Sequence, residues 1–376
     1  AWKLLDNLSG KNRRKNPQPL RIDGTTITNK KAKADAFNKH FAAVNKSARR
    51  RCIDRPLRKL LKIQEKATTA HDQIFEETFT PGEMETALTK LKNRKAPGQD
   101  RIWNEMIKHL GISAKSSLLK FINRTWIEGK LPRAWRTATI RPVPKPGKST
   151  DELKNFRPIS LTSSIGKLAE RMVNQRLYWW LEKNGLLDST QAGFRKGCRT
   201  EDQLFRLTQK TIDGFQEKRS TVAVFIDLQQ AYDRVWRQGL FMKMWRLGVH
   251  GKMYHWIKAF LRDRTIQTTI DGQVSSLHTL EEGLPQGSAL SCTLFLIFLN
   301  DLPGYLDVNK ALFADDLVIW STSKYPILSQ GRLNEALLTI SAFANFWKLK
   351  VNYSKTVYSV FTRSPQTAKR NFKLHI

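Results

Sequence analysis

Cysteine and long apolar runs are scarce in this sequence. Its 376 residues include three cysteines, Cys52, Cys198 and Cys292, which are too few and too widely spread for a disulfide framework or a Cys/His zinc cluster. This usage is typical of a reducing compartment. The longest apolar stretch, around residues 294–299, is far shorter than the ~20 residues that cross a bilayer, and no charged-then-apolar leader opens the chain. We therefore expect a protein that is neither secreted nor inserted in a membrane.

Acidic residues are also scarce. The chain has 65 Lys and Arg but only 33 Asp and Glu, which gives a formal net charge of +32. So many positive side chains repel one another unless a polyanion neutralises them, so nucleic acid is the expected partner. An inert basic surface and an anionic membrane are the alternatives, but the sequence shows no isolated basic amphipathic helix that would favour the membrane.

The first 70 residues are the most basic part of the chain. They hold 19 Lys and Arg against 5 Asp and Glu, with clusters at residues 11–15 and at Arg49-Arg50-Arg51. We expect this segment to contact phosphates without reading sequence, against the alternative of a solvated tail. The rest is long enough for two or three subdomains, because a single core stops growing at ~250 to 300 residues.

Two helices are marked by their ends. Thr80 and Glu83 form a capping box around a proline, which predicts a helix start. Apolar residues at helical spacing predict a second, longer helix that begins at Ser163 or Ser164 and stops at Gly185. Between them, an extended run near residue 138 enters a basic loop rich in Pro and Gly. That pattern predicts a β-hairpin exposing cations.

Carboxylates at the ends of apolar strands are the strongest chemical signal. Residues 221–227 form a continuous apolar run that ends in Asp227, which predicts a buried strand with an acid at its exit. Residues 310–320 consist of two short apolar runs joined by Asp315 and Asp316, a pattern that predicts a hairpin with two acids at its tip. If strand and hairpin pair in one sheet, the acids meet at one edge and suit two Mg²⁺ ions for nucleotidyl transfer. The alternative is a plain turn and an ordinary helix cap.

Several motifs resemble those of one polymerase family. Phe313-Ala314-Asp315-Asp316 resembles the two-aspartate hairpin of reverse transcriptases, residues 227–236 resemble their first palm motif, and residues 283–291 resemble the motif between the two. Upstream motifs extend the resemblance over roughly residues 75–362. In their order along the chain and in their amino-acid sequences, the motifs resemble those of the reverse transcriptases of non-LTR (LINE-type, jockey-like) retrotransposons. Residues 95–101 depart from the family pattern Lys-Ala-Pro-Gly-Pro-Asp-Gly at two positions, with Gln99 in place of Pro and Arg101 in place of Gly.

The resemblance implies an α+β right-hand polymerase fold, with a small antiparallel palm sheet flanked by helices. It divides the chain into a basic N-terminal extension (1–75), fingers (76–215) and a palm (216–376) that ends before the primer grip, so we expect the thumb to be absent. It implies an RNA-directed DNA polymerase with an RNA template, a DNA primer, deoxynucleoside triphosphates and two Mg²⁺ ions, with Mn²⁺ as a substitute. It also implies a ribonucleoprotein of the nucleus and cytoplasm.

The resemblance assigns roles to individual residues. Asp227 and Asp315 are expected to bind the metals directly, and Asp316 is expected to participate more weakly. Asp233 is expected to be a helix cap or a salt-bridge partner. Further residues are expected to contact the incoming nucleotide: Lys145 and Arg157 at the triphosphate, Tyr232 under the sugar, Gln286 at the nucleotide and template, and Lys355 at the pyrophosphate.

Each of these roles has a plainer alternative. Tyr232 is alternatively a core aromatic packed on Trp236, and Lys355 a surface lysine after a strand. The whole chain is alternatively a catalytically inactive, RNA-binding remnant of such an element. A third possibility is an RNA-dependent RNA polymerase or a group II intron-type maturase. Such enzymes share the palm but lack the fingers-motif sequences found in this chain.

Overall fold

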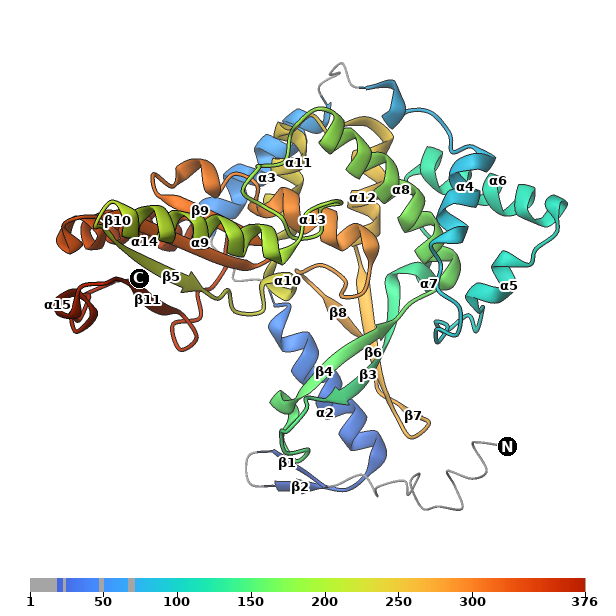
Figure 1. Ribbon diagram of the computed structural model, residues 1–376. Coiled ribbons are helices and arrows are strands. Elements are labelled where there is room, and N and C mark those ends of the chain that lie inside the picture. Colours follow the sequence, from blue (N-terminus) through green and yellow to red (C-terminus); the bar gives the residue numbers. More distant parts are fainter. Residues whose placement is uncertain (1–18, 23–24, 47–50, 67–71, 376) are drawn as a thin grey trace, which may run out of the picture.

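The structure is a computed structural model that describes residues 19–22, 25–46, 51–66 and 72–375 (Figure 1). The basic cluster at residues 11–15 and the side chains of Arg49 to Arg51 lie outside this description. Helices and strands are mixed along the chain, as expected for an α+β protein. Figure 1 shows a helical body from which one sheet extends to the left and a second sheet, with α2, extends downward.

The first sheet carries the predicted acids. Its four antiparallel strands follow the order β11 (Val357–Phe361), β5 (Ser220–Ile226), β10 (Asp316–Ser323) and β9 (Asn309–Phe313). The predicted strand and hairpin are confirmed, and they pair with each other. β5 is apolar from Val222 to Ile226, which suits a strand covered on both faces of the sheet, by α14 (Pro326–Phe346) on one side and α9 (Thr200–Gln216) on the other.

Side chains of β5 point alternately to the two faces of the sheet, and each face belongs to a different core. Val222, Val224 and Ile226 join the main core, which also contains the buried side chains of α14. Ala223 lies in a smaller core with Leu207 of α9. Because strand residues alternate between faces, a shift of register by one residue would exchange the two sets.

The second sheet combines distant parts of the chain. Its order is β4 (Phe156–Leu161), β3 (Thr137–Pro144), β6 (Arg264–Ile270) and β7 (Gln273–Val274), and β8 (His278–Leu280) also pairs with β6. The predicted hairpin is confirmed as the antiparallel pair β3 and β4. β6 joins β3 in parallel, so a segment from the expected palm range completes the sheet of the expected fingers range. The three-part division itself remains a prediction.

Helix α2 (Lys30–Val44) covers the second sheet. Phe37 and Phe41 pack in a small core with Ile140 and Ile266. The fully buried Asn38 donates from Nδ2 to the carbonyl oxygens of Ile266 and Ser276, and its Oδ1 accepts from the Thr268 hydroxyl. These bonds satisfy a polar side chain that would otherwise destabilise the interface. The described part of the basic N-terminal segment therefore packs into the fold.

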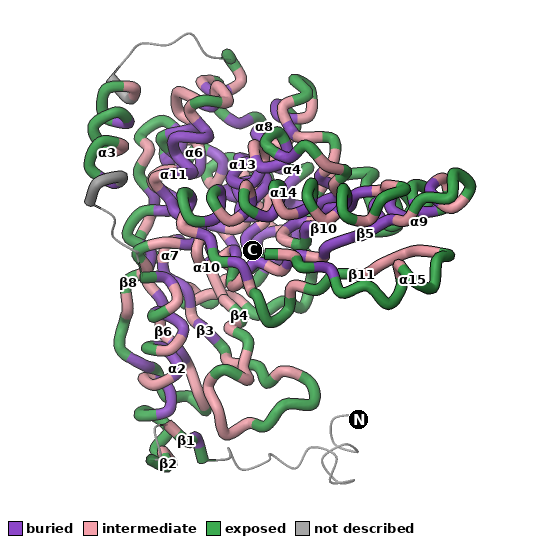
Figure 2. The backbone as a smooth tube through the Cα atoms, turned by 90° about the vertical axis from the view of Figure 1, so that its left-hand side faces the viewer, coloured by how far each residue is buried: buried purple, intermediate pink, exposed green. Residues whose placement is uncertain are grey.

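Two helices form the centre of the body. The predicted long helix is confirmed as α8 (Ser164–Lys183), capped by Ser163 and followed by Gly185 with a φ of +59°. It packs against the apolar helix α13 (Ala289–Leu299). Figure 2 shows buried backbone concentrated around α11, α13 and α14, whereas α15 and the β1–β2 pair are largely exposed. Among the described helices, none is long and apolar enough to cross a membrane.

The remaining elements surround these helices. They are β1 (Leu20–Ile22), β2 (Thr25–Ile27), α3 (Arg51–Lys66), η1 (Gln73–Phe75), α4 (Pro81–Thr89), α5 (Asn104–Lys108), α6 (Ile112–Glu128), α7 (Arg133–Arg136), η2 (Leu153–Asn155), α10 (Ala231–Arg234), α11 (Arg237–Arg246), α12 (Gly251–Leu261), η3 (Pro303–Tyr305) and α15 (Pro365–Ala368). α3 is basic and amphipathic, but it packs on the main core through Leu61 and contacts α11, so it is not the isolated helix that the membrane alternative requires. Its exposed Arg55, Lys59 and Lys62 contrast with the buried Leu61.

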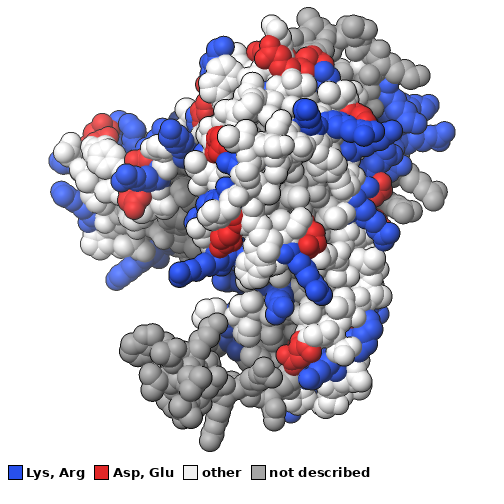
Figure 3. Space-filling model, turned by 90° about the vertical axis from the view of Figure 1, so that its right-hand side faces the viewer, with Lys and Arg blue, Asp and Glu red and all other residues white. Residues whose placement is uncertain are grey.

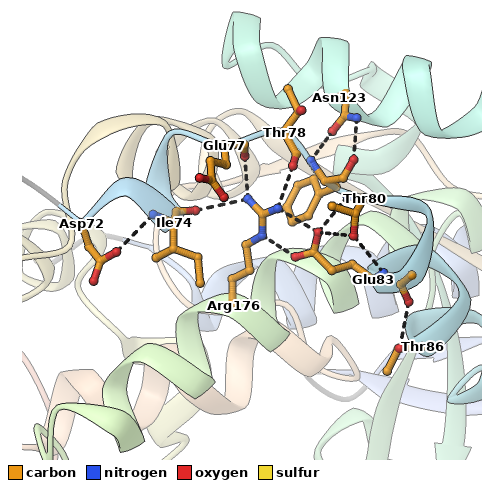
Figure 4. A network of polar contacts seen from close by, with 11 residues as sticks. Asp72, Ile74, Glu77, Thr78, Thr80, Glu83, Thr86, Asn123 and Arg176 are labelled. Carbon is orange, nitrogen blue, oxygen red and sulfur yellow. Dashed lines mark hydrogen bonds and ion pairs between the residues drawn. The ribbon is translucent and has the colours of Figure 1, made fainter.

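A buried arginine joins α8 to the segment before α4 (Figure 4). Arg176 donates two hydrogen bonds to the Glu83 carboxylate, at 2.5 and 2.8 Å, and further bonds to the carbonyl oxygens of Ile74, Glu77 and Thr78. Its guanidinium also lies 4.1 Å from the centre of the Phe79 ring. Since Glu83 completes the confirmed capping box of α4, the helix start and this ion pair depend on the same carboxylate.

We expect Arg176→Met to destabilise the protein by about 3 to 5 kcal/mol, because it leaves the half-buried Glu83 without its cation. Thermal and urea denaturation measure the loss. The matched control is Arg124→Met, which removes an exposed ion pair with Glu128 and should leave the melting temperature unchanged. Equal losses in the two variants would contradict a special role for the buried pair.

Candidate functional site

The register of the first sheet brings the acids to one edge. Ile226 is opposite Leu317 in the β5–β10 pair, so Asp227, which follows Ile226, comes opposite Asp316, which precedes Leu317. Asp315 is in the two-residue turn between β9 and β10. The prediction that strand and hairpin meet in one sheet, with their acids together, is confirmed in this geometric sense.

The hairpin turn is strained and held in place. Ala314 has a φ of +58°, in the left-handed region that favours glycine at the first position of such a turn. Gln191, only 6% exposed, accepts from the Ala314 N–H at 2.9 Å and donates to the Ala314 carbonyl at 3.1 Å. A Cβ on Gly193 would come within 2.0 Å of the Ala314 nitrogen, so only glycine allows this approach. Sequence reasoning missed this role of Gln191.

Like charges crowd the edge. Burial raises the pKa of Asp315, and the neighbouring carboxylates Asp316 and Asp227 raise it further, whereas Lys355 lowers it. Asp316 is exposed and Asp227 is half-buried. A cation at this edge would relieve the repulsion among the three carboxylates.

The segment before β11 orients Asp227. The Asn352 side chain donates to Oδ2 of Asp227 at 2.6 Å, and the Asn352 backbone N–H donates to the Asp227 carbonyl at 2.8 Å. Lys355 Nζ lies 3.9 Å from the same Oδ2. The Lys355 ammonium thus lies near Asp227, while its side chain is largely exposed, as the alternative of a surface lysine also expects. Asn352 is a contact that sequence reasoning missed, although it lies only three residues before Lys355.

A pocket of about 410 Å³ lies beside this edge, between the start of α9 and the sheet. Its polar wall includes Asp227, Asp316 and Lys355. The opposite wall is provided mainly by α9, through Thr200, Gln203, Leu204 and Leu207. A ligand in this pocket would therefore touch two of the acids and the lysine.

The donor set suits a hard divalent cation. Mg²⁺ prefers oxygen ligands and is usually bound by one or two carboxylates together with substrate phosphates. Within the described residues, no three His, Cys, Asp or Glu side chains are arranged as a ready-made metal cage. Asp227 and Asp315 fit the Mg²⁺ pattern, in which the substrate supplies the remaining oxygens.

Tyr232 lies in α10, just beyond Asp227. Its ring stacks on Phe295 of α13, with centroids 4.4 Å apart, and meets the edge of the Phe194 ring. Its hydroxyl is buried beside the Cys292 thiol, and burial raises its pKa, as does Cys292. Tyr232 thus packs against the main core, as in the alternative of a core aromatic, but its ring partner is Phe295, whereas Trp236 packs against Trp347.

Gln286 and Asp233 form a pair. The Gln286 amide donates to both carboxylate oxygens of Asp233 at 2.9 Å. Burial raises the pKa of Asp233 to about 6, although the Gln286 hydrogen bond lowers it. Asp233 therefore binds an amide, which corrects its expected role as a cap or salt-bridge partner.

Nearby, Ser288 caps α13 and donates to the buried Glu170 of α8, so the loop before α13 is anchored at both ends.

The predicted fingers cations lie on the β3–β4 hairpin. Lys145 donates from Nζ to the Lys154 carbonyl at 2.7 Å, across its own hairpin. Arg157 is exposed and sits opposite Val143. No hydrogen bond or ion pair within the described structure joins either residue to the three aspartates.

Arg101, where the family has glycine, adopts a φ of +56°, a conformation that costs a non-glycine residue about 1 to 2 kcal/mol.

Comparison with known proteins agrees with this geometry. The family model described as "Reverse transcriptase (RNA-dependent DNA polymerase)" matches residues 143–373. The chain is 36% identical over 297 residues to "Probable RNA-directed DNA polymerase from transposon BS" of Drosophila melanogaster, covering 76% of this chain and 33% of that protein. It is 33% identical over 287 residues to "RNA-directed DNA polymerase from mobile element jockey" of the same species, covering 74% of this chain and 31% of that protein.

The chain spans about a third of the length of these curated relatives. The matched family region includes the strand, the hairpin and all three aspartates. Because the family model covers more than half of the chain and the matched motifs meet at one sheet edge, the protein belongs to the reverse transcriptase family.

Proposed function

We propose that this chain is the catalytic part of an RNA-directed DNA polymerase of the non-LTR retrotransposon kind. Membership of the family implies the polymerase fold, in which we assign residues 76–215 to the fingers and 216–376 to the palm. The observation that carries the proposal is the β5–β10 register, which sets Asp227 opposite Asp316 and beside Asp315. The names of the similar proteins support the same activity.

Asp227 and Asp315 would hold two Mg²⁺ ions, with Asp316 contributing less. When bound, the ions activate a primer 3′-hydroxyl and stabilise the leaving pyrophosphate. Asn352 fixes the direction of one Asp227 oxygen. Lys355 lies where it can supply positive charge to the pyrophosphate. Mn²⁺ is the expected substitute ion.

Contacts to the incoming deoxynucleotide are assigned to five residues. Tyr232 would lie under the sugar, and Gln286, whose amide is held by Asp233, would contact the nucleotide and the template. Lys145 and Arg157 would reach the triphosphate, which requires the β3–β4 hairpin to approach the palm. Lys355, the fifth residue, would contact the pyrophosphate.

The polyanionic partners are an RNA template and a DNA primer, and the +32 charge supports them. Figure 3 shows Lys and Arg side chains gathered along one flank of the molecule, whereas acidic side chains are scattered. We propose a ribonucleoprotein of the nucleus and cytoplasm. An inactive remnant would bind RNA yet extend no primer, so primer extension with Mg²⁺ on an RNA template tests the proposal.

Asp227→Asn and Asp315→Asn should each lower the rate of primer extension by ~3 to 5 orders of magnitude, which is ~4 to 7 kcal/mol of barrier. RNA binding should be nearly unchanged, because Lys and Arg contacts supply it. Mn²⁺ binding, followed by electron paramagnetic resonance, should weaken in parallel. The control is Asp307→Asn, an exposed residue ahead of the same hairpin. A tenth of the original rate in either variant would refute the assignment.

Tyr232→Val tests the gate against ribonucleotides. If the ring excludes a 2′-hydroxyl, its removal should admit ribonucleotides while much of the deoxynucleotide rate persists. The measurement is the ratio of incorporation efficiencies for the two kinds of substrate. Since the ring stacks on Phe295, a loss of ~3 kcal/mol in stability is also expected. Tyr254→Val, in the core away from the acids, is the control for cavity effects alone. A ratio that stays fixed in Tyr232→Val would rule out the gate.

Gln191→Met tests whether the hairpin turn depends on its clamp. The substitution keeps the length of the side chain but leaves the N–H and carbonyl of Ala314 without partners, at ~1 to 3 kcal/mol each. We expect kcat to fall and Mn²⁺ affinity to fall with it, because Asp315 is next in the turn. Gln175→Met is the matched control, since the Oε1 of Gln175 has no partner. A drop in stability with unchanged Mn²⁺ affinity would show that Gln191 acts on folding only.

A further inference from the structure

A second pocket lies away from the acids, where α6 meets α7 and α12. Its volume is about 680 Å³, within the ~300 to 1,000 Å³ typical of ligand sites. One wall is formed by residues 126–131, from the end of α6 and the loop after it. The other is formed by α12 and the residues that follow it. None of the three aspartates belongs to these elements.

Cations dominate the lining of this pocket. Five are Lys or Arg, and only two lining residues are acidic. The cations come from three separate segments: Lys130, Arg136, Lys252, Lys258 and Arg262. Such convergence of positive charge in a concave site concentrates field lines and attracts anions.

The two lining acids neutralise little of this charge, although Lys252 is paired with Glu76, which lies outside the lining, at 3.2 Å. Glu128 pairs with Arg124, which does not line the pocket, at 2.7 Å. Asp263 lies 3.4 Å from Arg136 and is itself largely exposed. Lys130 and Arg262 are exposed, and their side chains make no hydrogen bond or ion pair within the described structure. Both are therefore available to an anion.

Two hydrogen-bond donors of the lining residues lack acceptors. Trp126 is fully buried, and its Nε1–H has no partner; the Nε–H of Arg136 is likewise buried and unpaired. Indole and guanidinium groups can only donate. Both atoms are inaccessible to solvent, so a ligand in the open pocket would contact the exposed cations of the lining and not these donors.

We propose that this pocket binds the phosphodiester backbone of a single nucleic-acid strand, as a site separate from the polymerase centre. Phosphate oxygens match the exposed cations of the lining, Lys130 and Arg262. A single strand can enter a concave pocket, whereas the phosphates of a duplex lie on a convex surface. The exposed ring of His255, also in the lining, can stack on a base. The site would hold a strand on the face formed by α6 and α12.

The test is the salt dependence of binding to a labelled oligouridylate, without metal or nucleotide, so that it does not depend on polymerase activity. Lys130→Ala/Arg262→Ala should flatten the log-log slope by about 1.4, since each contact to a single strand contributes ~0.7. Between 50 and 200 mM salt, that change amounts to about sevenfold in affinity. Lys120→Ala/Arg246→Ala, one lysine and one arginine that are exposed outside the pocket, is the matched control and should keep the original slope.

Equal slopes in the original protein and the pocket variant would overturn the proposal, as would equal losses in the two double variants. Oligothymidylate distinguishes the source of the strand: a loss for both polymers supports contacts through phosphate alone, and a loss for RNA only supports an added contact to the 2′-hydroxyl. Melting temperatures verify that both variants fold. Ultraviolet crosslinking of a 4-thiouridine RNA should label peptides from residues 126–131 or 252–262, and labelling confined to other peptides would contradict the site.

Discussion

The register between β5 and β10 is the constraint on which the candidate active site depends. A strand shifted by one residue would turn Asp227 to the opposite face of the sheet and would bring Val222 and Val224 out of the main core. Burial on both faces makes that shift unfavourable, because each set of side chains fits only its own core. The apolar content of the strand thus determines where its terminal carboxylate lies.

Holding carboxylates together is unfavourable in itself, and several neighbours compensate. Asn352 and Lys355 approach Asp227 from the segment before β11, while Gln191 secures the strained turn that carries Asp315. These contacts come from parts of the chain that are far apart in sequence. These contacts hold the edge of the candidate active site without a metal, and a fixed geometry of this kind is the condition for precise positioning of a reacting group.

Polar groups inside the body serve a similar purpose for the larger elements. Arg176 attaches the start of α4 to α8, and Asn38 attaches α2 to the second sheet. The loop before α13 is held through Ser288 and Glu170. Because each of these buried groups is satisfied by several partners, the helices have few alternative ways to pack. The basic pocket between α6 and α12 differs, since its lining retains unpaired donors and positive charge.

The sequence by itself determined the strand before Asp227, the hairpin at Asp315 and Asp316, the capping box at Thr80 and the β3–β4 hairpin, because each depends on residues close together in the chain. Only the tertiary structure decided contacts between distant segments. The Gln191 clamp on Ala314, the Asn352 bond to Asp227 and the stacking of Tyr232 on Phe295 all join residues more than sixty positions apart. The parallel pairing of β6 with β3 and the pocket of α6 and α12 are of the same kind. Local patterns carry no information about such pairings, which arise when elements pack to bury their apolar faces.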